Sequence, residues 1–527
     1  MTYRVLVADP IAQDGIDRLA TEAEVEVRTG LSPEELRAIV GAYEALVVRS
    51  ETKVTADIID AGRRLLVIGR AGVGVDNIDL HAATQRGIVV VNAPTGNTVS
   101  AAEHTIGLML ALARHIPQAD ASLRRGEWKR SKFIGVELRG KTLGIIGLGQ
   151  VGSEVARRAR GLEMRLLAHD PFVPEERARA LGVELVELPR LLAESDFITV
   201  HTTLTPGTRG LIGAREIALM KPTVRLINTA RGGIIDEQAL LEAVRAGRIA
   251  GAAVDVFSKE PAPDTPLAKE ERIIVTPHLG ASTAEAQERV ALDVAEQVLA
   301  VLRGEPAPYA VNAPLVAPET LTVLQPYIAV AELVGSLATQ LSEGQLRDVT
   351  IEYTGSLALH DTTVLRASAI RGLLKPVAEG NVTIVNANLV AEQRGLHIVE
   401  RKDPSGDDGE PSHITVRVRT RAGETAVTGG VEHGQPHIVA LNGLRVDLTP
   451  SAGYLLLCDN MDRPGMIGAV GTKMGQFDIN ISAMKVGRRE PRGRALMVLE
   501  LDEEPTPEQI REIEAIPGIE RARLVRL

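Results

Sequence analysis

The chain has 527 residues, and at roughly 150 residues per domain this length predicts three or four domains. Hydrophobic residues make up 44% and charged residues 24%, as in ordinary globular proteins, while aromatic residues at 2% leave Val, Leu, Ile and Ala to build the cores. The net charge of -10 and the absence of a dense Lys/Arg run argue against nucleic acid or an anionic membrane as the main partner.

The cysteine content and the apolar segments bear on the cellular compartment. Cys458 is the only cysteine, so no intrachain disulfide can form, which is typical of a reducing cytosol. The first residues, MTYRVLVADP, pass directly into a strand pattern without the features of a signal peptide. We find no apolar run of about 18 residues that would span a membrane. We therefore expect a cytoplasmic protein.

The N-terminal region alternates short Val/Leu/Ile runs with helical segments. Strands are expected at 3–9, 25–30, 45–50, 65–72 and 87–94. Near-continuous apolar strands separated by helices indicate a parallel sheet covered on both faces. A long helix follows, with Ser100 and Glu103 as its expected capping box.

The same alternation restarts after this helix. Strands are expected within 141–152, 163–170, 196–202, 223–230, 251–256 and 272–278. This predicts a second doubly wound α/β domain over residues 98–285. Ser282 and Glu285 are expected to cap a helix over 284–304 that returns the chain to the first unit, so that residues 1–97 plus 286–315 form one discontinuous domain.

The C-terminal part has a different pattern. A Pro/Ala-rich stretch, 304–318, is typical of a linker, and a mixed α+β domain is expected over 316–452, with an exposed loop at 401–412. Residues 453–527 follow a βαββαβ order, which is the ferredoxin-like pattern.

The motif GLGQVG follows an apolar strand and opens a helix. Gly147 permits the tight turn, Gly149 lets the backbone approach a pyrophosphate, and Gly152 lets helix and strand pack closely. Asp170 lies eighteen residues after Gly152, where an acid can hydrogen-bond the adenosine ribose and repel a 2′-phosphate. The motif in this context predicts a binding site for NAD rather than NADP.

Three reactive side chains follow later strand ends. They are Arg231 in NTARGGIID, Glu260 in VDVFSKEPAPD and His278 in TPHLGAST. Singly, each has an ordinary interpretation: a salt-bridge arginine, a solvated glutamate, and a helix-cap or core histidine. Ligands of open parallel sheets bind outside the carboxyl ends of the strands, so together beside a nicotinamide site the three side chains fit one reaction.

These motifs carry a family resemblance. GLGQVG, NTARGG, FSKEP and PHLGAST, in this order, resemble those of the D-2-hydroxyacid dehydrogenase family over residues 1–315. The four-part layout resembles the long-form D-3-phosphoglycerate dehydrogenase family, with an intervening domain and a C-terminal ACT domain. The resemblance implies NAD-dependent oxidation of 3-phospho-D-glycerate to 3-phosphohydroxypyruvate, the first committed step of L-serine biosynthesis, in a homotetramer.

The resemblance also implies residue roles, and no metal. His278 would exchange the proton of the C2 hydroxyl, Glu260 would hold the imidazole, and Arg231 would bind the substrate carboxylate. The expected cofactor contacts are Gly147, Gly149, Gln150, Val151, Gly152, Asp170, Thr202, Thr229, Ala230, Asp255, His278, Gly280 and Ala281. The expected substrate contacts are Arg49, Ser50, Arg70, Gly72, Asn97, Lys129 and Arg231, of which Lys129 or its neighbours would reach a partner subunit.

Regulation is expected in the C-terminal half. The segment from Cys458 to Arg488 resembles the ACT signature, and Asn460, Asp462 and Asn480 are its candidate ligands for L-serine. Some relatives use the intervening domain as an anion site, but the corresponding tract here, 433–450, has few basic residues besides His437 and Arg445. A structural spacer in oligomer assembly is therefore the preferred interpretation of this domain.

Two alternatives remain open at this stage. One is another D-2-hydroxyacid dehydrogenase, including an enzyme that reduces 2-oxoglutarate, although such enzymes do not ordinarily carry a long C-terminal extension. The other is an NAD-sensing scaffold built on the same fold, which would bind NADH without turnover.

Overall fold

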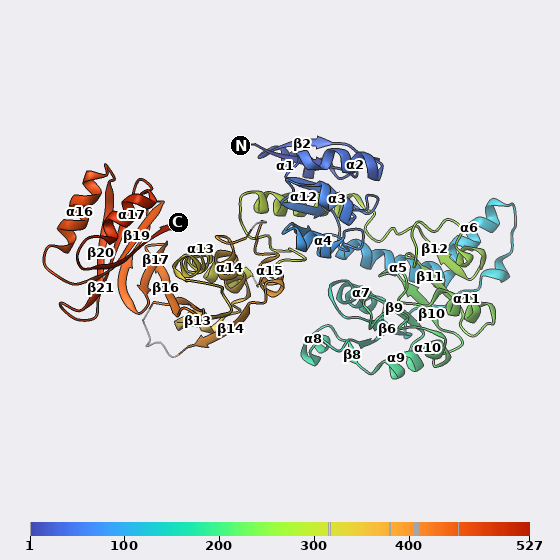
Figure 1. Ribbon diagram of the computed structural model, residues 1–527. Coiled ribbons are helices and arrows are strands. Elements are labelled where there is room, and N and C mark those ends of the chain that lie inside the picture. Colours follow the sequence, from blue (N-terminus) through green and yellow to red (C-terminus); the bar gives the residue numbers. More distant parts are fainter. Residues whose placement is uncertain (1, 315, 317, 379–380, 405–410, 452) are drawn as a thin grey trace.

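The computed structural model describes residues 2–314, 316, 318–378, 381–404, 411–451 and 453–527. In chain order, the described residues build a five-stranded, a seven-stranded, a six-stranded and a four-stranded sheet. Figure 1 shows the unit with the seven-stranded sheet at one end of the molecule and the C-terminal unit at the other, with the remaining two units between them. Two parallel α/β units followed by two α+β units confirm the predicted fold class.

The N-terminal unit is a parallel sheet in the order β2-β1-β3-β4-β5. Its strands are β1 (Tyr3–Val7), β2 (Ala23–Val27), β3 (Ala45–Val48), β4 (Val67–Arg70) and β5 (Val89–Asn92), and its helices are α1 (Gln13–Ala20), α2 (Pro33–Ile39), η1 (Val40–Ala42), α3 (Ala56–Ala61) and α4 (Leu80–Gln85). The central strand β3 is buried at every position, because helices cover both faces of the sheet. One of these covers comes from far along the chain: α12 (Ala284–Leu302) places Val290, Val294 and Val298 in the core of this sheet.

The second unit is a parallel sheet in the order β12-β11-β10-β9-β6-β7-β8. Its strands are β6 (Thr142–Ile146), β7 (Arg165–His169), β8 (Glu184–Leu185), β9 (Phe197–Val200), β10 (Arg225–Asn228), β11 (Gly251–Val254) and β12 (Ile273–Val275). Its helices are α5 (Thr98–Arg114), α6 (Ile116–Arg124), η2 (Arg130–Phe133), α7 (Gln150–Gly161), α8 (Glu175–Ala180), α9 (Leu188–Glu194), α10 (Ala214–Ala218), α11 (Glu237–Arg245) and η3 (Pro266–Lys269). The strand order reverses between β6 and β9, so a ligand crevice is expected at their carboxyl ends.

Neither long helix begins with the predicted cap. Helix α5 starts at Thr98, and Ser100 lies inside it, where its hydroxyl donates to the Gly280 carbonyl at 2.9 Å. Helix α12 is capped by Thr283, whose hydroxyl accepts from the Ala286 amide at 3.2 Å. The capping box at residues 100–103 was wrong because a tertiary contact, which local sequence does not reveal, uses the serine.

Part of the predicted linker packs on the N-terminal sheet. The Val311 amide donates to the Val90 carbonyl at 2.7 Å, and the Val90 amide donates to the Asn312 side chain at 2.8 Å. Residues 310–312 therefore extend the edge of β5 as an irregular strand. Residues 315 and 317 of this stretch lie outside the described residues.

The intervening unit is a six-stranded mixed sheet in the order β14-β13-β15-β16-β17-β18. Its elements are α13 (Pro318–Leu341), β13 (Asp348–Thr354), η4 (Gly355–Leu359), α14 (Thr363–Leu374), α15 (Ala387–Gln393), β14 (His397–Asp403), β15 (Ile414–Arg419), β16 (Glu424–Glu432), β17 (Gln435–Leu441) and β18 (Leu444–Leu448). Residues 401–403 of the predicted loop belong to β14, which corrects that boundary, and residues 405–410 lie outside the described residues.

Helix α13 bears on the expectation that no segment could span a membrane. Within the described residues, its stretch Glu319–Leu341 is long and apolar enough to do so, with a mean hydropathy of 1.4. A helix that is apolar on most sides belongs either to a membrane or to a core. Here Val330 and Val334 are fully buried in the core that α13 forms with α14 and β16. The helix is therefore a core element of this unit.

The C-terminal unit is a four-stranded antiparallel sheet in the order β20-β21-β19-β22. Its elements are β19 (Tyr454–Met461), α16 (Met466–Gln476), β20 (Ile481–Arg488), β21 (Arg494–Leu501), α17 (Pro507–Glu514) and β22 (Ile519–Arg526), which confirms the βαββαβ order. Leu455, Leu457 and Val525 share one apolar cluster with residues of the intervening unit. The two C-terminal units therefore pack together.

Candidate active site

The predicted catalytic side chains follow three neighbouring strands. Arg231 comes three residues after β10, Glu260 lies in the loop after β11, and His278 comes three residues after β12. These strands are adjacent and parallel in the sheet. Their carboxyl ends therefore meet at one edge, where ligands of such sheets bind.

His278 and Glu260 form a hydrogen-bonded pair. The Nδ1 atom of His278 lies 2.7 Å from Oε2 of Glu260, and Oε1 of Glu260 accepts from the Phe257 amide at 2.9 Å. Burial alone would raise the pKa of Glu260, but the hydrogen bonds from His278 and Phe257 outweigh it and lower the pKa. The carboxylate therefore stays ionised and fixes the orientation of the imidazole ring.

Arg231 reaches from the second unit toward the first. Its Nε atom lies 3.4 Å from Oδ2 of Asp76, and its Nη1 atom donates to the Ala230 carbonyl at 2.7 Å. A side chain at Gly74 would collide with the Arg231 guanidinium, and one at Gly72 would collide with that of Arg70. Gly72 and Gly74, between β4 and α4, therefore make room for the side chains of Arg70 and Arg231.

Arg70 lies in a cationic environment at the end of β4. Burial, followed by the neighbouring guanidinium groups of Arg231 and Arg49, lowers the pKa of Arg70 to about 10. Its Nε atom is buried and has no hydrogen-bond partner among the described residues. A buried guanidinium nitrogen without a partner, beside two further cations, indicates a site for an anion.

Asp255 positions the loop that carries His278. Its Oδ1 atom accepts from the Thr276 hydroxyl at 2.6 Å and the Leu279 amide at 2.8 Å, and its Oδ2 atom accepts from the Gly280 amide at 2.9 Å. The Nε2 atom of His104 on α5 lies 3.2 Å from Oδ1. The structure thus gives Asp255 a positioning role, while its predicted contact with the cofactor stays a prediction.

The glycine loop has the predicted turn between β6 and α7. Gly147 has φ 92°, and an added Cβ there would lie 2.6 Å from the His201 carbonyl. A Cβ at Gly152 would collide with the Gly147 carbonyl, so the first turn of α7 packs directly on the loop. A side chain at Gly149 would point into open space, which leaves room for a ligand at the helix N-terminus.

Two further features of this crevice fit a dinucleotide. Thr202 follows β9 at the reversal of strand order, and its hydroxyl is buried without a hydrogen-bond partner among the described residues. Asp170, at the end of β7, accepts from the Leu148 amide at 2.8 Å and from the Phe172 amide at 2.9 Å. Asp170 thereby holds the glycine loop, and its predicted bond to a ribose would be additional. The open loop and the unpaired hydroxyl match the needs of NAD.

The other predicted contacts divide into two groups. Thr229 and Ala230 lie beside Arg231 in the β10 loop, Gly280 and Ala281 follow His278, and Asn97 opens α5. Lys129 instead lies beyond α6, with 57% of its side chain exposed and an ion pair to Glu127 at 3.2 Å. Within this chain Lys129 therefore pairs with Glu127 and does not join Arg49, Arg70 and Arg231. Its reach into a partner subunit stays a prediction. Ser50 is exposed beside Arg49.

The predicted effector residues lie at two ends of the C-terminal sheet. Asp462 accepts from Arg488 and, at 3.0 Å, from the Arg492 amide, close to Asn460. Asn480 directly precedes β20 and donates to Asp502 at 2.6 Å. The first residue of β20, Ile481, pairs with Leu501, and Leu501 also pairs with Tyr454, the first residue of β19. Asn480 therefore lies at the end of the sheet where β19 begins. A single chain therefore does not bring Asn480 together with Asn460 and Asp462.

The intervening tract is occupied by its own ion pairs. His437 lies 2.9 Å from Glu432, and Arg445 lies 2.6 Å from Asp447. His437 and Arg445 thus face acidic partners. The preference for a structural spacer over an anion site at this position stays a prediction.

Comparison with known proteins identifies the family. The D-isomer specific 2-hydroxyacid dehydrogenase NAD binding domain matches residues 106–280, the D-3-phosphoglycerate dehydrogenase intervening domain matches residues 323–442, and the ACT domain matches residues 454–518. A D-3-phosphoglycerate dehydrogenase of Archaeoglobus fulgidus is 47% identical over 99% of this chain and 100% of its own length. The chain belongs to the D-3-phosphoglycerate dehydrogenase family. The family member from Bacillus subtilis is 43% identical over 100% of both chains.

Solved structures of relatives cover the first two units. The TT0316 protein from Thermus thermophilus matches with a TM-score of 0.55 and 37% identity, over 58% of this chain and 99% of its own. A D-lactate dehydrogenase from Aquifex aeolicus, complexed with NAD and lactic acid, matches with a TM-score of 0.54 and 28% identity, over 59% of this chain and 99% of its own. This chain thus joins an NAD-binding dehydrogenase half to an intervening domain and an ACT domain.

One positioning residue was not predicted from the sequence. His104 lies in the middle of α5, and its Nε2 atom is 3.3 Å from the Thr276 hydroxyl and 3.2 Å from Asp255. A histidine in an apolar helix suggests a buried partner, which is the only signal that local sequence provides. The partner itself becomes visible only when α5 and β12 are brought together.

Proposed function

We propose that this protein oxidises 3-phospho-D-glycerate to 3-phosphohydroxypyruvate with NAD, as the first committed step of L-serine biosynthesis. The observation that carries the proposal is the His278–Glu260 pair at 2.7 Å, on the same sheet edge as Arg231. The Arg231 guanidinium in turn neighbours that of Arg70, at the end of β4 in the N-terminal sheet. The names and full-length similarity of the relatives support the choice of substrate.

The acid–base step follows from the orientation of His278. A carboxylate only accepts hydrogen bonds, so Nδ1 of the ring carries the proton that faces Glu260, and Nε2 is the nitrogen that can accept the proton of a C2 hydroxyl. The protonated ring then has Glu260 as its counter-ion. NAD, when bound, supplies the acceptor for the hydride that leaves C2.

The arginines supply the sites for the two anionic groups of the substrate. Arg231 can bind the carboxylate through two parallel hydrogen bonds, and this contact would replace its pair with Asp76. Arg70 and Arg49 remain for the phosphate at the other end of the substrate. A substrate with two anionic ends would therefore be held between the two units.

The cofactor site would use the glycine loop and the residues beside it. The amides at the start of α7, including those of Gln150 and Val151, would bind the pyrophosphate. Thr202 would donate its unpaired hydroxyl to the cofactor. Asp170 would disfavour a 2′-phosphate by its charge, which supports NAD over NADP.

Regulation and assembly complete the proposal. L-Serine would bind between two ACT domains through Asn460, Asp462 and Asn480, which requires at least two chains. A homotetramer in the cytoplasm is the proposed form, with Lys129 reaching a partner's site. Light scattering of the purified protein measures the number of chains directly.

A nicotinamide absorbance assay tests the activity. The purified protein is supplied with NADH and phosphohydroxypyruvate, with hydroxypyruvate as the matched substrate that lacks the phosphate, each with and without L-serine. The proposal predicts a strong preference for the phosphorylated acid and inhibition by L-serine. Equal use of both acids would indicate another D-2-hydroxyacid dehydrogenase, and NADH binding without any turnover would indicate a sensing scaffold.

A further inference from the structure

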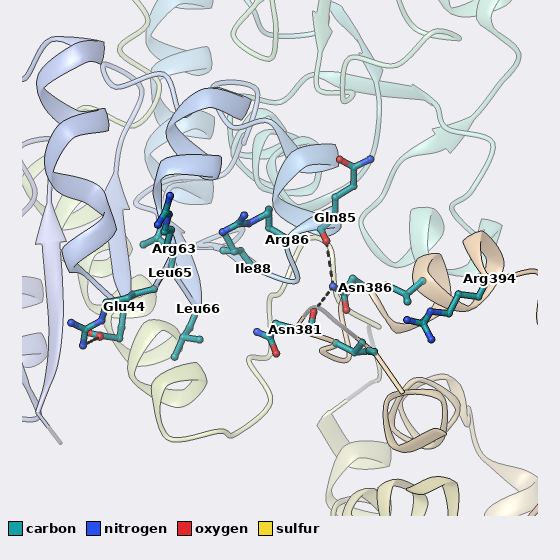
Figure 2. A pocket seen from close by; sticks show the side chains of 14 residues that line it. Glu44, Arg63, Leu65, Leu66, Gln85, Arg86, Ile88, Asn381, Asn386 and Arg394 are labelled. Atoms are coloured by element: carbon teal, nitrogen blue, oxygen red, sulfur yellow. Dashed lines mark hydrogen bonds and ion pairs between the residues drawn. The ribbon is translucent and has the colours of Figure 1, made fainter. Parts of the chain in front are cut away.

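A second cationic cavity lies between the N-terminal and intervening units (Figure 2). Its volume is about 600 Å³, which is in the range of small-molecule sites. Glu44, Leu66 and Ile88 on its wall lie just before β3, β4 and β5. Arg49 and Arg70, which are proposed to bind the substrate phosphate, lie at the carboxyl ends of β3 and β4, so this junction cavity lies at the opposite edge of the sheet.

The charge of the junction cavity is opposite to that of the protein. The described lining residues include four arginines (Arg63, Arg64, Arg86 and Arg394) and one acid, Glu44, in a chain whose net charge is -10. Arg64 forms an ion pair with Glu44. Among the described residues, no acidic side chain pairs with the other three arginines. The described part of the wall therefore has three cations without an acidic partner.

The rest of the described lining is apolar or carries amide groups. Leu65, Ile88 and Val382 are at most 8% exposed and form an apolar floor beneath the exposed arginines. In Figure 2, Asn381 and Asn386 lie between Arg86 and Arg394, and the Asn386 amide is engaged by the Gln85 and Asn381 carbonyls. The 14 lining residues include no aromatic side chain, so nothing in the wall would stack on a nucleobase.

The two walls of the junction cavity are already held together. The Thr383 hydroxyl donates to the Gly87 carbonyl at 3.0 Å, and Nδ2 of Asn386 donates to the carbonyls of Gln85 at 3.3 Å and Asn381 at 3.0 Å. A molecule bound to both Arg86 and Arg394 would add to these contacts. It would thereby restrain the intervening unit against the N-terminal unit.

We propose that the junction cavity binds an aliphatic metabolite with two or more negative charges. Arg63 and Arg86 of the N-terminal unit and Arg394 of the intervening unit hold its anionic groups. Three guanidinium groups around one cavity carry this assignment, because none has an acidic partner among the described residues and guanidinium groups bind carboxylate or phosphate through parallel hydrogen bonds. Arg394 also donates from Nη1 to the Val377 carbonyl at 3.0 Å. It is independent of the proposed activity and of the effector site in the ACT domain.

Hydrogen exchange on the full-length protein tests the proposal. The probes are citrate, glucose 6-phosphate and, as the matched neutral molecule, glucose, all at constant ionic strength. We expect citrate, glucose 6-phosphate or both to slow exchange in peptides covering 85–90 and 381–394, and glucose to have no effect. Peptides covering 49–52 and 70–76 report separately on any anion bound at the active site.

Matched variants distinguish the junction cavity from general charge effects. The double variant Arg86→Gln and Arg394→Gln should weaken this protection by at least ~10-fold in anion concentration, since two charge-assisted contacts are lost. Arg37→Ala and Arg421→Ala remove exposed arginines of the same two units outside the cavity and should leave the protection unchanged. Arg394→Glu is a second, independent test, and this variant should also lose the slowed exchange on addition of the anion.

The outcomes separate the sources of the ligand and can overturn the proposal. Protection by citrate alone identifies a polycarboxylate, and protection by glucose 6-phosphate alone identifies a phosphate ester. If neither anion protects these peptides in the wild-type protein, or if the folded double variant keeps the protection, the proposal is wrong. A wild-type protein without turnover would count against the proposed activity and leave the exchange result standing.

Discussion

The His278 ring is held on one side and open to substrate on the other. Its Nδ1 atom is engaged by Glu260 at 2.7 Å, so only Nε2 can serve the C2 hydroxyl. Replacing this ring by a methyl group removes the proton acceptor without removing the arginines that bind substrate. His278→Ala should lower kcat by at least ~100-fold, the lower range for a general acid or base. Steady-state kinetics measure this, and near-normal turnover would exclude the assigned role.

Glu260 should influence the pH dependence of the reaction more than its maximal rate. The hydrogen bonds that lower its pKa keep the carboxylate charged throughout the working range. Glu260→Gln removes that charge beside a protonated imidazole, so the proton is lost more readily. The acid limb of the kcat/KM profile for oxidation should therefore move to lower pH, with a smaller loss of kcat than in His278→Ala. An unmoved limb would refute the electrostatic role of the pair.

The arginines at the ends of β3 and β4 should discriminate between substrates. Arg49→Glu places a negative charge beside Arg70, where the phosphate is proposed to bind. KM for phosphohydroxypyruvate should rise at least ~10-fold more than KM for hydroxypyruvate, because repulsion acts mainly on the phosphate. Because one variant is assayed with both substrates, hydroxypyruvate serves as the control for phosphohydroxypyruvate. Equal rises would show that Arg49 acts on the carboxylate end or on the fold.

At the scale of the element, the loop from Thr276 to Gly280 is shaped by one buried carboxylate. Asp255 is fully buried and accepts three hydrogen bonds from this loop. Asp255→Asn turns one acceptor into a donor that faces other donors, and should destabilise the protein by about 2 kcal/mol, the scale of a broken buried network. It should also lower kcat, because His278 lies within this loop. Thermal unfolding and kinetics measure the two effects.

The same carboxylate gives this stabilisation a defined pH dependence. Burial alone would raise the pKa of Asp255, but the hydrogen bonds from His104, Thr276 and Leu279 outweigh it, and the pKa lies below the ordinary 3.8. A depressed pKa contributes stability that is present above 3.8 and is lost as the pH falls through the lower value of the folded state. In Asp255→Asn, the free energy of unfolding should lack this part of its dependence on pH. If the acid unfolding curves of the variant and the wild-type protein run parallel, this prediction is wrong.

Sequence alone was sufficient for the elements that are set by local pattern. The apolar runs predicted the parallel strands, because strands buried on both faces must be apolar throughout. They did not predict β8, which has only two residues and no run to detect. The cap at Ser100 was wrong because a tertiary contact with Gly280 uses its hydroxyl. The cap at Ser282 was wrong by one residue, because the adjacent Thr283 accepts from the Ala286 amide.

At the scale of the whole molecule, the site depends on contacts between distant segments. Strand-end placement was enough to bring Arg231, Glu260 and His278 to one edge, since parallel strands share their direction. The pairs Arg231–Asp76 and His104–Asp255 join residues more than 150 positions apart, and no local signal pairs them. The junction cavity likewise exists only through the packing of the intervening unit on the N-terminal sheet.

The proposed effector site is also a property of more than one chain. Asp462 lies at the end of β19, whereas Asn480 lies beside the start of that strand, so two paired ACT domains are needed to bring them together. Asp462→Ala and Asn480→Ala should each weaken L-serine inhibition at least ~10-fold, since each removes one polar partner of the ligand. Mixed chains of the two variants, unfolded and refolded together, have one intact site per pair and one doubly altered site. Inhibition at the wild-type serine concentration should therefore reappear in the mixture, with reduced amplitude. Separately refolded variants are the control, and a mixture as insensitive as its components would place the effector site within a single chain.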